Sequence, residues 1–160
     1  MNARRRLSLR IPAGLLAAAA LGTPAAAPRR ARAAEPDPAV PEVVAKAIPG
    51  ARLLGQGTYR WFGFRVYDAR LFANPQDIDA AAPTRSPLAL ELAYARSFDG
   101  AAIAGRSDEE MATIGRGDPA ERARWRVLMS SVFPDVREGD RLLGLWRPGG
   151  PTRLYYNGRA

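Results

Sequence analysis

The stretch GQGTYRWFGFRVYDARLF, residues 55–72, decides the fold because it lies across two strand-like runs. These runs are Leu53–Trp61 and Phe64–Ala73, and they are broken at Gly63. Successive side chains of a strand point to opposite faces of a sheet. In the second run this gives two sets of side chains: Val66, Asp68, Arg70 and Phe72 on one face, and Tyr67, Ala69 and Leu71 on the other.

The rest of the sequence predicts a β-β-β, α-α, β-β order behind a short helix over Glu42–Ile48. A third strand is predicted over Leu88–Ala95, with leucines and a tyrosine on one face and mostly alanines on the other. The small alanine face leaves room for packed helices or for a cavity. A closing β-hairpin is predicted from Arg141–Trp146 and Thr152–Tyr156, joined by a Pro-Gly-rich turn.

Two capping boxes predict the starts of the two helices. Ser107 stands three residues before Glu110, and Asp118 stands three residues before Glu121 with Pro119 at the first helical position. The second helix carries one apolar stripe at helical spacing: Trp125, Leu128, Met129 and Val132. Three arginines lie largely off this stripe and are interpreted as a solvated face: Arg122, Arg124 and Arg126.

The amino-acid composition excludes several kinds of chemistry. The 160 residues allow one domain and include neither Cys nor His. A Cys/His zinc site, a disulfide, a cysteine nucleophile, a Ser-His-Asp triad and a His-ligated haem are therefore excluded. We expect no cofactor and no metal. Any catalysis would depend on carboxylates, Tyr, Arg, Ser, Thr or the single lysine, Lys46.

The first 34 residues are interpreted as a signal peptide. They contain seven arginines and no acidic residue, and an apolar block of eleven residues, Ile11–Leu21, follows Arg10. That block is too short to span a bilayer as a helix. We expect cleavage near Ala33 or Ala34 and export to the periplasm or beyond, by the general or the twin-arginine route. The alternative, an organelle transit peptide, is disfavoured by the uninterrupted apolar block.

The net charge of +8 belongs almost wholly to this leader, because the remaining residues carry 17 basic and 16 acidic side chains. We therefore expect neither a nucleic-acid partner nor, after cleavage, a membrane span. Residues 35–41, with three prolines, are predicted to form an extended linker before one domain over residues 42–160. Asn157-Gly158 is a strong hairpin signal with no strand after it, so we predict that the domain is truncated at its C-terminal end. The oligomeric state is left open.

Five segments of the sequence, in order, resemble the bacterial chalcone isomerase-like family. They are residues 55–72, 88–96, 107–111, 133–144 and 154–158. The resemblance implies an α+β fold, an open-faced β-sandwich whose antiparallel sheet has a helical layer over it and a ligand cleft between. In the wider family, plant enzymes close a chalcone to a flavanone, and other members bind fatty acids without catalysis.

Most groups of the plant enzymes' mechanism are missing. Aligned without a gap, Leu54 and Val66 take the positions of the family's Arg and Thr, whereas one gap places Arg60 at the Arg position. Ile103 and Glu110 fall near the positions of its Tyr and Asn, and no lysine lies in that region. Stabilising an enolate or phenolate needs several placed donors, so isomerase activity is not expected.

The sequence therefore favours a non-catalytic, exported protein that binds a small lipophilic ligand such as a fatty acid. Arg60 lies among aromatic residues and could meet a carboxylate in an apolar cleft, with hydroxyls from Tyr67 and Tyr94. The alternatives are an exposed strand arginine and two tyrosines of the core. The alternative functions are an isomerase of the chalcone isomerase type, an intramolecular lyase, and a structural or partner-binding envelope module.

Overall fold

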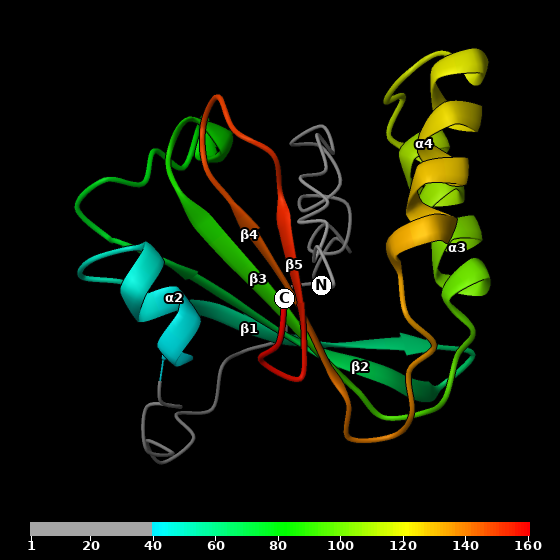
Figure 1. Ribbon diagram of the computed structural model, residues 1–160, viewed down its shortest axis with the longest axis horizontal. Coiled ribbons are helices and arrows are strands. Elements are labelled where there is room, and N and C mark those ends of the chain that lie inside the picture. The colour runs from blue at the N-terminus through cyan, green and yellow to red at the C-terminus, as the bar shows by residue number, and fades with distance from the viewer. Residues whose placement is uncertain (1–39) are drawn as a thin grey trace, which may run out of the picture.

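A five-stranded antiparallel sheet forms the centre of the fold in the computed structural model, which describes residues 40–160 (Figure 1). The signal peptide and most of the linker predicted from the sequence lie outside the described residues. The elements follow the predicted order: α2 (Glu42–Ala47), β1 (Arg52–Trp61), β2 (Phe64–Ala73), the 3-10 turn η1 (Pro83–Arg85), β3 (Leu88–Tyr94), α3 (Gly100–Thr113), α4 (Pro119–Val132), β4 (Arg141–Trp146) and β5 (Arg153–Tyr156).

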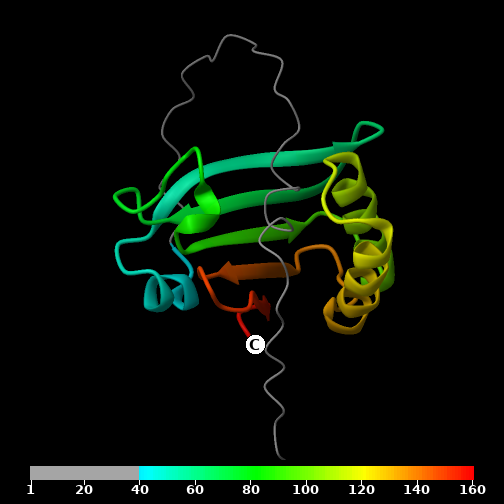
Figure 2. The same ribbon diagram turned by 90° about the horizontal axis from the view of Figure 1, so that it is seen from above.

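The strands lie side by side in chain order, and the α3–α4 pair is inserted between β3 and β4 (Figure 2). The register places Tyr67 opposite Tyr94 and Phe72 opposite Ala89. Because the side chains alternate, these two pairs belong to opposite faces of the sheet. The alternation predicted for β3, and for β2 from Tyr67 onward, agrees with this register. The prediction is wrong for Val66, because the β1–β2 pairing shifts register there and Val66 lines the same cavity as Tyr67. We call the face with Phe72 and Ala89 the α2 face and the face with Tyr67 and Tyr94 the α3 face.

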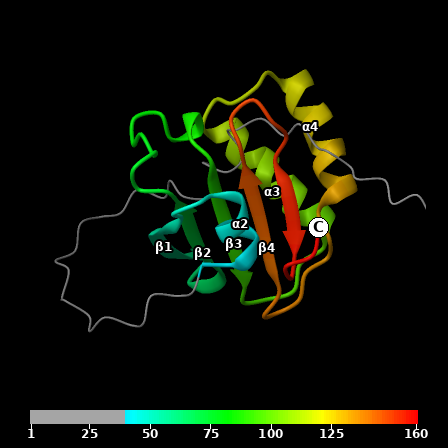
Figure 3. The same ribbon diagram turned by 60° about the vertical axis from the view of Figure 1, so that its left-hand side comes forward.

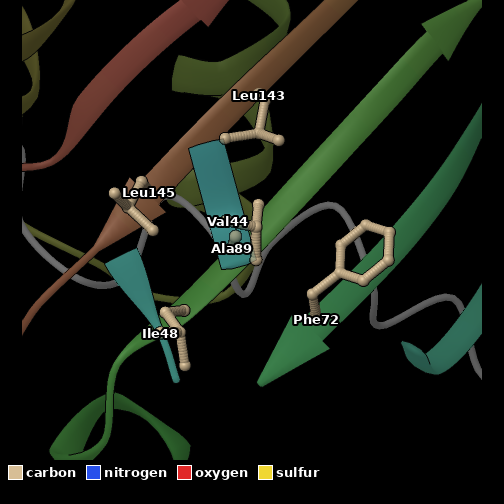
Figure 4. Packing of buried hydrophobic residues seen from close by; sticks show 6 residues of the cluster. All are labelled: Val44, Ile48, Phe72, Ala89, Leu143 and Leu145. Atoms are coloured by element: carbon tan, nitrogen blue, oxygen red, sulfur yellow. The ribbon is translucent and has the colours of Figure 1, made fainter. Parts of the chain in front are cut away.

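The α2 face is covered by the short N-terminal helix. Val44 and Ile48 pack against Phe72, Ala89 and residues of β4, in a cluster whose members are all nearly inaccessible to solvent. Figure 4 shows Val44 lying next to the small side chain of Ala89. The alanines of β3 thus leave room for a packed helix, which was one of the two possibilities, and the cavity described below lies on the opposite face.

Helix α3 begins earlier than the sequence predicted. Ser107 is not an N-cap: it lies within the helix, and its hydroxyl donates to the carbonyl of Ile103 at 2.9 Å. The helix starts at Gly100, whose N–H donates to the carboxylate of Asp135 at 2.9 Å. The cap therefore comes from a residue far along the chain, because Asp99 at the N-cap position makes no capping bond with its own side chain.

Helix α4 begins as predicted. Asp118 and Glu121 form a complete capping box, and Pro119 is the first helical residue. The predicted apolar stripe faces α3: Met129 is buried against Ala104 and Met111, and Trp125 packs on the same cluster. The two helices pack on each other and stand together as a pair (Figure 3).

The C-terminal strands form the predicted hairpin, with Leu143 opposite Tyr155 and Gly144 opposite Leu154. Beyond β5 the chain turns at Asn157, and its side-chain amide donates to the Asp140 carboxylate at 2.9 Å. The predicted truncation stays a prediction. Among residues 40–160, no helix is long and apolar enough to cross a bilayer.

Candidate functional site

A cavity of about 730 Å³ lies between the α3 face of the sheet and helix α3. Its floor consists of leucines from three neighbouring strands: Leu90 and Leu92 of β3, Leu142 of β4 and Leu154 of β5. Its wall on α3 includes Ala101, Ala102, Ile103 and Gly105. The leucines of the sheet and these apolar residues of α3, three of them small, bound an apolar space that an extended hydrocarbon could fill.

Gly105 has a direct effect on the size of this cavity. It lies in the interior of α3, and a β-carbon placed on it would meet no atom within 4 Å. Glycine in a helix interior is less favourable than alanine by about 1 kcal/mol. No turn, positive φ or close packing in the described structure calls for glycine at this position. The absence of a side chain here enlarges the cavity.

A row of aromatic rings crosses the end of the cavity nearest the β1–β2 turn. Tyr59 stacks on Tyr67 with 5.1 Å between ring centres, and Tyr67 meets Tyr94 edge-on at 6.0 Å. Phe98 lies a further 6.0 Å from Tyr94. These contacts hold the two inner tyrosine rings in fixed positions, and all four residues line the cavity.

A cluster of polar groups lies at the same end of the cavity. The guanidinium of Arg106 donates to Glu109 at 2.8 Å, to Glu110, and to the hydroxyl of Tyr59 at 3.3 Å. Arginine has five N–H donors, so two remain for a further partner. The Arg106 side chain is 50% exposed, which places this polar end where the cavity meets solvent. The cavity thus joins an apolar body to one polar end.

Burial raises the pKa of Tyr67 to about 12, and its proximity to Tyr59 and Glu110 adds to the effect. Burial also raises the pKa of Tyr94. Both hydroxyls are therefore protonated at neutral pH and can act as hydrogen-bond donors, but not as bases. This limits the proton-transfer chemistry that the inner part of the cavity can support.

The raised pKa of Tyr67 predicts how stability changes at alkaline pH. An unfolded tyrosine ionises near pH 10, so below that pH Tyr67 is protonated in both the folded and the unfolded state and stability does not depend on its titration. Between about pH 10 and 12 the unfolded chain loses this proton first, and the free energy of unfolding falls. Urea unfolding across this range is expected to show a shallower fall for Tyr67→Phe than for the wild type. Equal slopes would show that Tyr67 is not shielded from water.

The structure separates the three residues that the sequence analysis placed in the ligand site. Tyr67 and Tyr94 line the cavity, but Arg60 does not. Arg60 is exposed, and its Nη1 donates to the carbonyl of Gly63 at 3.2 Å. It follows Tyr59 in the strand, and since Tyr59 points into the cavity, the alternation directs Arg60 elsewhere. Ligand contact by Tyr67 and Tyr94 stays a prediction.

Arg106 is the polar residue that the sequence analysis missed. Placing the helix start at Ser107 left Arg106 outside the helix, whereas it lies in the middle of α3. Its spacing to Glu109 and Glu110, three and four residues, is the signal that could have placed it on a helix with ion-pair partners. Within the described part of the chain, no cluster of acidic side chains is suited to hold a metal ion.

No protein-family model matches the chain, and no curated protein matches its sequence. Among solved structures, the chain is similar to the crystal structure of the Arabidopsis thaliana fatty-acid binding protein AtFAP1, with a TM-score of 0.52 and 14% sequence identity. The similarity covers 69% of this chain and 71% of the plant protein. The chain therefore has the chalcone isomerase-like fold, an open antiparallel five-stranded sheet with helices packed against it.

Proposed function

We propose that the protein binds a small lipophilic ligand with one polar end, such as a fatty acid, without transforming it. The observation that carries this proposal is the shape and chemistry of the cavity: a leucine floor, a wall of small residues, and Arg106 with Tyr59 at one end. An aliphatic chain would replace water on the leucines, which is favourable in proportion to the apolar area covered. A carboxylate would take the free donors of Arg106.

The fold of the plant neighbour supports this choice of ligand, since that protein is described as a fatty-acid binding protein. The two glutamates beside Arg106 set a condition on the ligand. Together the two carboxylates carry one negative charge more than the guanidinium offsets, so a ligand carboxylate must displace Glu109 or Glu110 from Arg106. We therefore expect the apolar chain to supply most of the affinity and the arginine to select the polar end.

Two observations support binding without catalysis. The single lysine, Lys46, lies on α2, on the other face of the sheet, where it is 74% exposed and paired with Glu42. Ile103, near the position of the family's tyrosine, lines the cavity with an apolar side chain. We further propose that the chain is an exported member of the bacterial branch of this fold, on the strength of its leader and of the five sequence segments.

The test compares dodecanoate with dodecanol, which share a chain and differ in the polar end. Both are expected to bind the wild type. Arg106→Gln is expected to lower the affinity for dodecanoate about tenfold. This is the low end of the range for losing a hydrogen bond to a charged group, because the guanidinium is half exposed to solvent. The affinity for dodecanol should not change. Titration calorimetry measures both.

The matched control is Arg60→Gln, which removes a neighbouring arginine that lies outside the cavity. It should leave both affinities unchanged. A wild type that binds neither molecule would overturn the proposal. If Arg60→Gln lowered the affinity for dodecanoate as much as Arg106→Gln, the ligand carboxylate would lie near Arg60, as first expected from the sequence.

A further inference from the structure

The turn between β1 and β2 exposes three large aromatic side chains. We call residues 60–65 the hairpin tip. Within it, Trp61 is 58% exposed, Phe62 82% and Phe64 58%. Figure 2 shows this turn protruding from the sheet at the end where the α3–α4 pair stands. Adjoining exposed aromatic rings on a protruding turn mark an interaction surface far more often than isolated apolar residues do.

The backbone of the tip is strained at Phe62. Its φ is 46° and that of Gly63 is 78°, so both central residues of the turn are left-handed. Such turns favour Asn-Gly, because asparagine tolerates this conformation and a bulky side chain does not. A phenylalanine at this position costs conformational energy and leaves its ring in water. An energetic cost of this kind is typical of a residue whose side chain serves a contact outside the folded chain.

The charge around the rings is positive. Arg60 and Arg65 belong to the tip, and the guanidinium of Arg96 lies 4.6 Å from the centre of the Phe64 ring. Arg65 is paired with Asp68, the only carboxylate among residues 59–70. Within residues 40–160 neither Arg60 nor Arg96 has a carboxylate partner. The aromatic rings of the tip therefore lie beside two guanidinium groups, those of Arg60 and Arg96, that form no ion pair within residues 40–160.

We propose that the hairpin tip docks onto the surface of an anionic lipid bilayer. Tryptophan and phenylalanine side chains enter the boundary between headgroups and acyl chains, and arginine is attracted to anionic headgroups. A narrow protruding turn penetrates a soft interface without needing a groove to receive it. The tip has the geometry, the aromatic content and the charge for this contact.

The tip is also continuous with the cavity. Trp61 belongs to the tip and lines the cavity, and Tyr59, two residues earlier on the same strand face, touches Arg106. A lipophilic molecule that leaves the bilayer beside Trp61 would meet the aromatic row and then the leucine floor. This entry route, unlike the docking itself, rests on the proposed function. It explains why the opening of an apolar cavity lies next to exposed aromatic residues.

The experiment measures quenching of tryptophan emission by vesicles with brominated acyl chains, using the full chain. The leader contains no tryptophan, and the three in the chain are Trp61, Trp125 and Trp146. Quenching that is present in the wild type and lost in Trp61→Phe therefore reports insertion of the tip. Such quenching is expected with vesicles of phosphatidylcholine mixed with phosphatidylglycerol. It should weaken at high salt and with phosphatidylcholine alone.

Two double variants separate the contributions of the rings and the charges. Phe62→Asn with Phe64→Ser should weaken binding at least about tenfold, since two rings lose their burial in the interface. Asparagine suits the left-handed turn, so the fold should be retained. Arg60→Gln with Arg96→Gln should weaken binding to anionic vesicles about tenfold and leave neutral vesicles unaffected. Val127→Ser, which removes a 73% exposed apolar side chain from α4, is the control and should change nothing.

Equal quenching in the wild type and Trp61→Phe would overturn the proposal, as would an equal loss of binding in Val127→Ser. The proposal would also be overturned if vesicles did not quench the wild type and the double variant Phe62→Asn with Phe64→Ser changed the oligomeric state. That result would identify the tip as an interface between copies of the chain. The double variant Phe62→Asn with Phe64→Ser should still bind dodecanoate in the absence of vesicles. If the protein docks on vesicles but does not bind dodecanoate, this inference stands and the proposed function is refuted. If it binds dodecanoate but does not dock, the proposed function stands and this inference is refuted.

Discussion

Gly105→Phe is expected to abolish binding of a lipophilic ligand while leaving the protein folded. A side chain at this position leaves α3 into open space on the cavity side, so the ring enters the space proposed for the ligand. Phenylalanine is also a better helix former than glycine, by less than the roughly 1 kcal/mol that separates glycine from alanine. The affinity for dodecanoate should fall at least about tenfold, equivalent to about 1.4 kcal/mol. The melting temperature should stay the same or rise.

Two controls make this result specific. Gly105→Ala adds one methyl group and should raise the melting temperature with little effect on affinity. Ala123→Phe adds the same ring at an exposed position of α4 that does not line the cavity, and it should not affect binding. If Gly105→Phe bound dodecanoate as tightly as the wild type, the ligand would have to bind elsewhere on the protein. Calorimetric titration and thermal unfolding supply the two readouts.

Glu91→Gln is expected to cause the largest loss of stability. Glu91 is 5% exposed on the α2 face of the sheet, and its carboxylate accepts from Arg70 Nε at 2.7 Å and from Arg141 Nη1 at 3.2 Å. Arg70 is itself largely buried, so the substitution leaves its charge without a partner in a poorly solvated place. Breaking a buried ion pair by removing one partner costs about 3–5 kcal/mol. Urea unfolding measures the free energy.

A double substitution tests this physical reason. Glu91→Leu combined with Arg70→Met removes both charges and fills the space with apolar groups, so it should cost less than Glu91→Gln alone. Lys46→Gln breaks an ion pair whose side chains are 74% and 81% exposed, and should leave the free energy of unfolding nearly unchanged. If Glu91→Gln lowered the free energy of unfolding no more than Lys46→Gln does, Glu91 and Arg70 would be better hydrated than their burial indicates.

Local patterns predicted most of the secondary structure. Alternation of side chains defined β2 and β3, and the capping box with Pro119 defined the start of α4. The start of α3 could not be found in this way. It depends on the carboxylate of Asp135 and on close contact between helices, since a β-carbon on Gly100 would lie 2.1 Å from the carbonyl oxygen of Phe133. Both partners of Gly100 lie more than thirty residues away in the sequence.

The candidate site shows the same division. Strand alternation grouped Tyr67 with Leu71, and Tyr94 with Leu92, because it is a local property. That the two tyrosines share one face follows from the register between β2 and β3. Arg106 could not, because its role follows from Tyr59 of β1 meeting α3 across the cavity, at a distance of 47 residues in sequence. Arg60 lies outside this cavity, as in the alternative of an exposed strand arginine, because its aromatic neighbours in sequence do not reveal on which side of the hairpin the helix pair lies.

The sequence by itself thus determined the order of strands and helices along the chain, the helix pair and the absence of His and Cys chemistry, because these depend on residue type and on spacing within one element or one turn. Only the tertiary structure decided which face of the sheet holds the cavity and which arginine lies at its polar end. Those features depend on contacts between elements distant in the chain, and side-chain periodicity within one strand or helix carries no information about its distant neighbours.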